Sequence, residues 1–190
     1  NVIGGEPGLG KSCWAVGLAV NIAHGLPAYC GYNLHTEHQR ALIVTTEQNY
    51  EEINVLLNSI YQASNLPPNG RLHFIKDDGM ETEELLNHIH KFVSEFKIDI
   101  LICDAWGDVY DKSPNDSSEI RKFLKTFNKL AGMHGFANLW VAHPCKNSFG
   151  RKKKMADLVG GQGLIARCRT VLFLESVGDS IRHLCIEKSN

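Results

Sequence analysis

Apolar residues along this chain follow two alternating spacings. Short runs rich in β-branched residues predict strands at Val2-Ile3, 40–47, 71–75, 98–104, 136–143, 170–175 and 181–188. Apolar residues at helical spacing predict helices over 11–24, 49–63, 85–96 and 120–131. This repetition favours an α/β fold with a mostly parallel central sheet and helices on both faces. The turn residues at 176–180 predict that the last two strands form a C-terminal antiparallel hairpin.

The length and composition predict a single domain over residues 1–190. They also argue against a strongly basic nucleic-acid-binding protein, a membrane-spanning protein and a disulfide-rich or zinc-finger protein. A net charge of −1 at pH 7 gives no overall basic field, so binding to nucleic acid would need a local patch. No apolar run approaches the roughly 20 residues of a membrane span. The six cysteines show no CxxC pair and no zinc-finger spacing, which favours free thiols in a cytoplasmic setting. Because the chain starts without Met, inside a predicted strand, we expect a domain truncated at both ends.

The glycine-rich segment after the first strand carries the clearest chemical signal. It fits the pattern G-x-x-x-x-G-K-[ST], with a strand before it and a helix after it. Glycines let backbone N–H groups curl around phosphate oxygens, and the helix directs its positive dipole end at the same anion. Lys11 would neutralise the β- and γ-phosphates, and the Ser12 hydroxyl would bind Mg²⁺. The predicted nucleotide-binding residues are Gly5, Glu6, Pro7, Gly8, Leu9, Gly10, Lys11, Ser12 and Cys13.

Polar residues end three of the predicted strands, at the sheet edge where α/β proteins bind ligands. Asp104 ends an apolar strand and is the predicted Mg²⁺ ligand, with Asp108 and Asp111 as weaker alternatives. Glu47 is predicted to orient or deprotonate the attacking water. His143 could donate to a γ-phosphate oxygen. The alternative for each is a purely local role, as a cap or hydrogen-bond partner at its own strand end.

Five segments in order resemble those of the RecA-like ATPases: GGEPGLGKS, ALIVTTE, ILICD, LWVAHPCK and GGQGLIARCRTVLFLE. The most similar subgroup is the RepA-type hexameric replicative helicases and their AAA-type relatives, with DnaB-type helicase cores and KaiC-like ATPases further off. The resemblance covers nearly the whole chain and implies a RecA-like P-loop NTPase fold that uses ATP and Mg²⁺. It implies that Lys11 and Ser12 bind the phosphates and Mg²⁺ and that Asp104 is the Walker B acid. It also implies that Glu47 is the catalytic glutamate and His143 the γ-phosphate sensor.

The same resemblance implies residues that act beyond the subunit's own nucleotide. Lys188 resembles a lysine that reaches the neighbouring subunit's nucleotide, and Arg167 and Arg169 are the arginine-finger candidates within this chain. The loop after His143 corresponds to one that touches single-stranded DNA in the central channel. Its basic run could instead be simply solvated, and the glycines at 160, 161 and 163 suggest a flexible loop. The candidate DNA-binding residues are Lys146, Phe149, Arg151, Lys152, Lys153 and Lys154.

These residues leave three functional hypotheses open. The first is a ring-forming, ATP-hydrolysing DNA helicase or replication ATPase of RepA type, assembled as a homohexamer on single-stranded DNA. The second is a KaiC-like or regulatory ATPase switch that acts on protein partners without DNA translocation. The third is a nucleotide-dependent binding module that does not translocate. A small-molecule kinase is disfavoured because the sequence has no arginine-rich lid segment.

Overall fold

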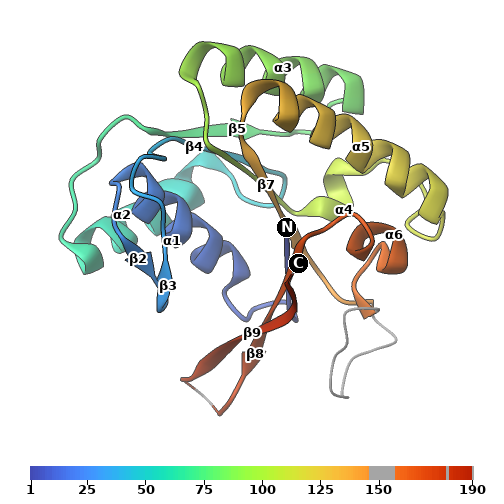
Figure 1. Cartoon of the computed structure of the whole chain (residues 1–190). Helices are drawn as coiled ribbons and strands as arrows, with labels where there is room; N and C mark the ends of the chain where they lie inside the picture. The colour runs from blue at the N-terminus through green and yellow to red at the C-terminus, as the bar shows by residue number, and fades with distance from the viewer. Residues whose placement is uncertain (146–156, 179, 190) are drawn as a thin grey trace.

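A seven-stranded sheet forms the centre of the molecule, in the order β5-β4-β6-β7-β1-β8-β9 (Figure 1). The computed structural model describes residues 1–145, 157–178 and 180–189. Neighbouring strands are parallel except β8 and β9, which pair antiparallel. The predicted α/β fold and its C-terminal hairpin are therefore confirmed. The strands are β1 (Val2–Gly4), β4 (Ala41–Thr45), β5 (Leu72–Lys76), β6 (Ile100–Asp104), β7 (Ala137–Ala142), β8 (Thr170–Ser176) and β9 (Arg182–Ser189).

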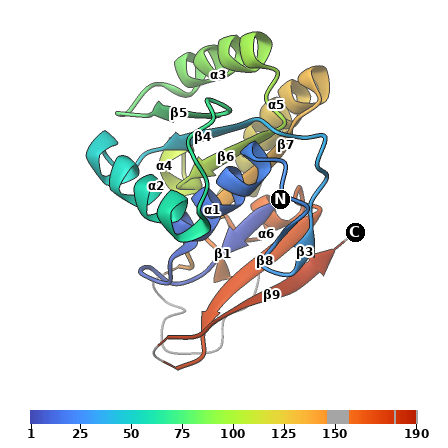
Figure 2. The ribbon, with the colours of Figure 1, turned by 90° about the vertical axis from the view of Figure 1, so that its left-hand side faces the viewer.

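Helices cover both faces of this sheet (Figure 2). On one face lie α1 (Lys11–Ala23) and α2 (Tyr50–Ser64), and on the other lie α3 (Thr82–Phe96) and α5 (Ser117–His134). Successive residues of a strand point to opposite faces, so Val2 and Ile3 belong to two different apolar cores. Because both faces are buried, the strands are continuous apolar runs rather than alternating ones. Within the described residues, no helix combines the length and the hydropathy needed to span a bilayer.

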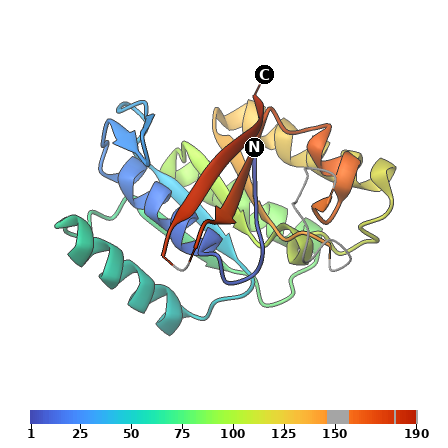
Figure 3. The same ribbon diagram turned by 90° about the horizontal axis from the view of Figure 1, so that it is seen from below.

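Several short elements were not predicted from the sequence. They are a hairpin of β2 (Ala28–Tyr29) and β3 (Tyr32–Asn33), the single turn α4 (Trp106–Val109), and α6 (Gly161–Ile165). The β8–β9 hairpin lies between α1 on one side and α6 on the other (Figure 3). The prediction of a flexible loop at the three glycines is wrong for Gly161 and Gly163, which lie in α6. A Cβ at Gly163 would lie 3.1 Å from the Cβ of Ile120, so this glycine allows α6 to pack closely on α5.

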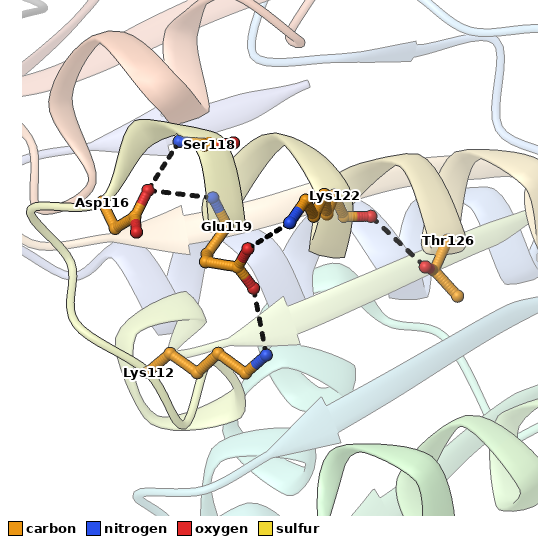
Figure 4. Close-up of polar contacts among 6 residues, drawn as sticks. All are labelled: Lys112, Asp116, Ser118, Glu119, Lys122 and Thr126. Atoms are coloured by element: carbon orange, nitrogen blue, oxygen red, sulfur yellow. Dashed lines mark hydrogen bonds and ion pairs between the residues drawn. The ribbon is translucent and has the colours of Figure 1, made fainter.

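The start of α5 is fixed by a group of polar contacts (Figure 4). One carboxylate oxygen of Asp116 accepts hydrogen bonds from the backbone N–H groups of Ser118 and Glu119, at 2.9 and 3.1 Å. Glu119 in turn forms ion pairs with Lys112 and Lys122, at 3.1 and 2.5 Å. Lys112 belongs to the segment that joins α4 to α5, so its ion pair connects that segment to the first turn of α5.

Candidate nucleotide-binding site

The loop between β1 and α1 has the backbone geometry of an anion-binding turn. Gly10 has a φ of 88°, in the left-handed region, and none of the described side chains caps the first turn of α1. The N–H groups at the start of this 13-residue helix are thus left for a ligand, where the helix dipole favours an anion. Earlier in the loop, a Cβ on Gly5 would lie 2.7 Å from the carbonyl oxygen of Leu174. The loop therefore runs directly against β8, where a larger residue would clash.

Lys11 is the first residue of α1 and is almost completely buried, with 4% of its surface exposed. Its ammonium donates a hydrogen bond to the carbonyl oxygen of Glu6, at 2.9 Å. Burial lowers the pKa of Lys11, while the charges of Asp104 and Glu47 raise that pKa. The lysine therefore lies beside the loop and close to both of the predicted acids.

Asp104 ends β6 and is also 4% exposed. Burial raises the pKa of Asp104, and the Ser12 hydroxyl, hydrogen-bonded to the carboxylate, opposes that shift. Its Oδ1 is buried and has no hydrogen-bond partner among the described residues. A carboxylate oxygen without a partner, next to a hydroxyl, fits the oxygen ligands that Mg²⁺ prefers. The described residues contain no cluster of three or more His, Cys, Asp or Glu side chains suited to a metal, so phosphates and water would complete such a site.

Glu47 and His143 meet across the strand that separates them. β4 ends at Thr45, so the strand predicted over 40–47 is shorter than expected and Glu47 lies in the turn before α2. Nε2 of His143, which follows β7, lies 3.1 Å from Oε1 of Glu47. The other ring nitrogen of His143 is buried and has no partner among the described residues. Since β6 lies between β4 and β7, this pair spans the tip of the strand that carries Asp104.

Lys11, Ser12, Glu47 and His143 line one cavity of about 700 Å³, whereas the buried Asp104 is not among the described residues that line it. Neither Asp108 nor Asp111 is among the described residues that line it. Sequence reasoning missed four lining residues, of which Gln48 and Pro144 directly follow predicted site residues, while Leu56 and Val159 are brought in by the fold. Val159 reaches the cavity because its backbone N–H bonds to the carbonyl of His143, at 2.9 Å. The lining residues are Pro7, Gly8, Gly10, Lys11, Ser12, Cys13, Glu47, Gln48, Leu56, His143, Pro144 and Val159.

The three residues predicted to act on a neighbouring subunit lie away from this cavity. Lys188 pairs with Val171 near the start of β8, and its ammonium donates to the carbonyl oxygens of Ile165 and Cys168, at 3.2 and 2.8 Å. Arg167 and Arg169 line a second cavity, of about 600 Å³, which includes Asp99. Asp99 directly precedes β6, so this second cavity lies at the opposite edge of the sheet from Asp104.

The predicted DNA-binding residues, Lys146, Phe149 and 151–154, lie outside the described residues. The chain on either side of them is held together. The N–H of Cys145 donates to the carbonyl of Asp157 at 2.6 Å, and Pro144 pairs with Leu158 in an antiparallel bridge. The described residues on both sides of the basic segment therefore lie at the cavity, next to His143.

Comparison with known families agrees with this geometry. The family model for the AAA domain matches residues 1–148, which include the glycine-rich loop, Glu47, Asp104 and His143. The chain belongs to this family. It is a nucleotide-binding P-loop ATPase domain of the AAA and RecA-like superfamily. No curated protein matches the chain.

Proposed function

We propose that this AAA domain is an ATP-hydrolysing motor of RepA type that assembles as a ring, most simply a hexamer, and acts on single-stranded DNA. The observation that carries the proposal is the convergence of Lys11, Asp104, Glu47 and His143 at one edge of the sheet. Each comes from a different element, and three of them come from the ends of the neighbouring strands β4, β6 and β7. This combination supports hydrolysis rather than nucleotide binding alone.

Each of these side chains has a distinct role in the proposed reaction. The loop N–H groups and Lys11 would bind the β- and γ-phosphates. Ser12 and Asp104 would hold Mg²⁺, which would supply positive charge to neutralise the phosphates. Glu47 orients the attacking water and accepts its proton. The imidazole of His143, now bonded to Glu47, is close enough to the same cavity to exchange that bond for one to a γ-phosphate oxygen.

The described residues that flank the basic segment 146–156 support the choice of single-stranded DNA as partner. The backbone on both sides of the segment lies beside His143, so a contact made by the segment could affect the phosphate sensor over a few residues. The sheet edge opposite the nucleotide carries Lys188, Arg167 and Arg169. In a ring, these side chains could contact the nucleotide of a neighbouring subunit. Lys188 would first have to leave the two carbonyls that it now contacts.

The test is phosphate release from ATP with and without single-stranded DNA, for the wild-type chain and for Glu47→Gln. We expect DNA to stimulate the wild type, and the DNA affinity to fall steeply as salt rises. Glu47→Gln should retain ATP but lose at least about a hundredfold in turnover, because the amide cannot accept a proton. Glu51→Gln is the control, since Glu51 is an exposed acid in the first turn of α2. Wild-type turnover in Glu47→Gln would remove Glu47 from the mechanism.

Two other outcomes would select the remaining hypotheses. ATP hydrolysis with nucleotide-dependent oligomerisation but no response to DNA would favour a KaiC-like switch on protein partners. Retention of nucleotide without any phosphate release would favour a binding module.

A further inference from the structure

Thr46, the residue before Glu47, is held by an unusual number of hydrogen bonds for a residue in a turn. Its N–H donates to the carbonyl of Asp104 at 2.8 Å, one step beyond the last β4–β6 pair. Its hydroxyl oxygen accepts from the N–H of Ala105 at 3.0 Å. The same oxygen lies 2.7 Å from Oδ2 of Asp108 and 3.3 Å from the carbonyl of Asp104. A hydroxyl has one hydrogen, so we assign it to the closer, charged acceptor, Asp108.

Asp108 is exposed, but the helical turn that carries it is fixed in the core. Trp106 in the same turn is 0% exposed and stacks on Tyr110, with ring centres 5.0 Å apart. The indole Nε1 donates to the carbonyl of Val159 at 3.0 Å, and Val159 in turn donates its N–H to the carbonyl of His143. The turn α4 is therefore bonded to the side chain of Thr46, the residue before Glu47. Through Val159 it is also connected to the backbone of His143.

Glu47 itself has little packing to define its position, because its side chain is 47% exposed. Apart from the contact of its carboxylate with His143, the position of Glu47 therefore depends on the backbone on either side. On the C-terminal side, the N–H of Gln48 donates to the Thr45 hydroxyl at 3.3 Å. On the N-terminal side, the hydroxyl of Thr46 joins the turn to α4. A displacement of about 1 Å in a reacting group can reduce a rate by about a hundredfold, so these bonds bear directly on turnover.

We propose that Thr46 and Asp108 are positioning residues for Glu47, and that their hydrogen bond holds the catalytic carboxylate at the distance that hydrolysis requires. The inference rests on the proposed function, because it assumes that Glu47 acts on water. It also assigns Asp108 a role other than that of a metal ligand. The Asp108 carboxylate already accepts a hydrogen bond from Thr46, whereas Oδ1 of Asp104 has no partner among the described residues.

Two pairs of variants separate the hydrogen bond from the shape of the side chains. Thr46→Val keeps the shape and removes the hydroxyl, whereas Thr46→Ser keeps the hydroxyl. Asp108→Ala removes the acceptor, whereas Asp108→Asn keeps a carbonyl oxygen that can accept from Thr46. Glu83→Ala is the surface control, because Glu83 is an exposed acid in the first turn of α3.

For each full-length variant we would measure kcat and KM for ATP by phosphate release, the dissociation constant of a fluorescent ATP analogue, the Mg²⁺ dependence and the melting temperature. Thr46→Val and Asp108→Ala should each lower kcat by about tenfold, with the analogue bound as in the wild type. Thr46→Ser and Asp108→Asn should recover most of that loss. The double variant Thr46→Val/Asp108→Ala should be no slower than Thr46→Val alone, because both substitutions remove the Thr46–Asp108 bond and Thr46→Val also removes the acceptor of the Ala105 N–H.

Three results would overturn the assignment: unchanged kcat in Thr46→Val, independent losses in the double variant, or a shifted Mg²⁺ dependence in Asp108→Asn that marks a metal ligand. Parallel losses of analogue affinity and melting temperature would mean that the bond is only structural. Glu47→Gln in the same assay distinguishes the two levels of inference. If Glu47→Gln is inactive while Thr46→Val is normal, only the positioning role fails; if Glu47→Gln is active, the proposed function and the positioning role fail together.

Discussion

Asp104→Asn should stabilise the protein free of metal and nucleotide, while removing its affinity for Mg²⁺ and ATP. In the free protein the carboxylate is 4% exposed, its Oδ1 has no described partner, and burial raises its pKa. A buried polar group without a partner costs about 1–3 kcal/mol, and more when it is charged. The nearby Lys11 ammonium and Ser12 hydroxyl offset part of this cost. We therefore expect a net gain of about 1 kcal/mol, or about 2–4 °C in melting temperature for a domain of this size.

The gain should depend on pH with a defined sign. The pKa of Asp104 lies above its ordinary value of 3.8 in the folded protein. The folded state therefore holds the proton more tightly than the unfolded state, and the wild type loses stability as pH rises from 3.8 towards the raised pKa. An amide does not titrate, so the advantage of Asp104→Asn should be greatest at neutral pH and should shrink as pH falls towards 3.8.

The assay is thermal unfolding in a chelator over a series of pH values, repeated with Mg²⁺ and ATP. Added Mg²⁺ and ATP should raise the melting temperature of the wild type but not that of Asp104→Asn. Asp99→Asn is an opposite control, because its carboxylate accepts hydrogen bonds from the N–H groups of Gln39 and Arg40, both at 3.0 Å. Asp99→Asn should therefore have a lower melting temperature than the wild type at neutral pH. An unchanged or lower melting temperature for metal-free Asp104→Asn at neutral pH would refute the reasoning.

Two further predictions concern the elements that support the site. Gly163→Val should destabilise the protein by about 1–3 kcal/mol, because the new Cβ would lie 3.1 Å from Ile120 and push α6 away from α5. Urea unfolding measures this change in stability. A variant as stable as the wild type would show that the two helices can separate at no cost. Asp116→Ala should lower the free energy of unfolding by about 1 kcal/mol, because it removes the cap of α5. Asp116→Asn should keep most of that stability, because the amide oxygen can still accept from the same N–H groups. Calorimetry distinguishes these two variants, and equal losses would contradict the capping role.

The fold class could be predicted from the sequence because each main element carries its own local signal. Buried parallel strands are continuous apolar runs, and the helices on the sheet show apolar residues at helical spacing, so element type and order were correct. The predicted element boundaries were less accurate, since β4 ends at Thr45 rather than at Glu47. The turn α4 and the helix α6 were missed, because elements of four and five residues have too few apolar positions to show a period. Gly163 also gave a misleading signal, since close packing against α5 requires a small residue there.

The sequence by itself determined the phosphate loop and the strand-end positions of Asp104, Glu47 and His143. A glycine-rich turn between a strand and a helix is a local feature, and parallel strands bring their carboxyl ends to one edge. Only the tertiary structure decided which of these side chains touch. The Glu47–His143 contact depends on β6 lying between β4 and β7, and the Thr46–Asp108 bond joins residues 62 positions apart. Strand order and such long-range contacts arise from the packing of the whole sheet, because no local stretch of the chain contains both partners.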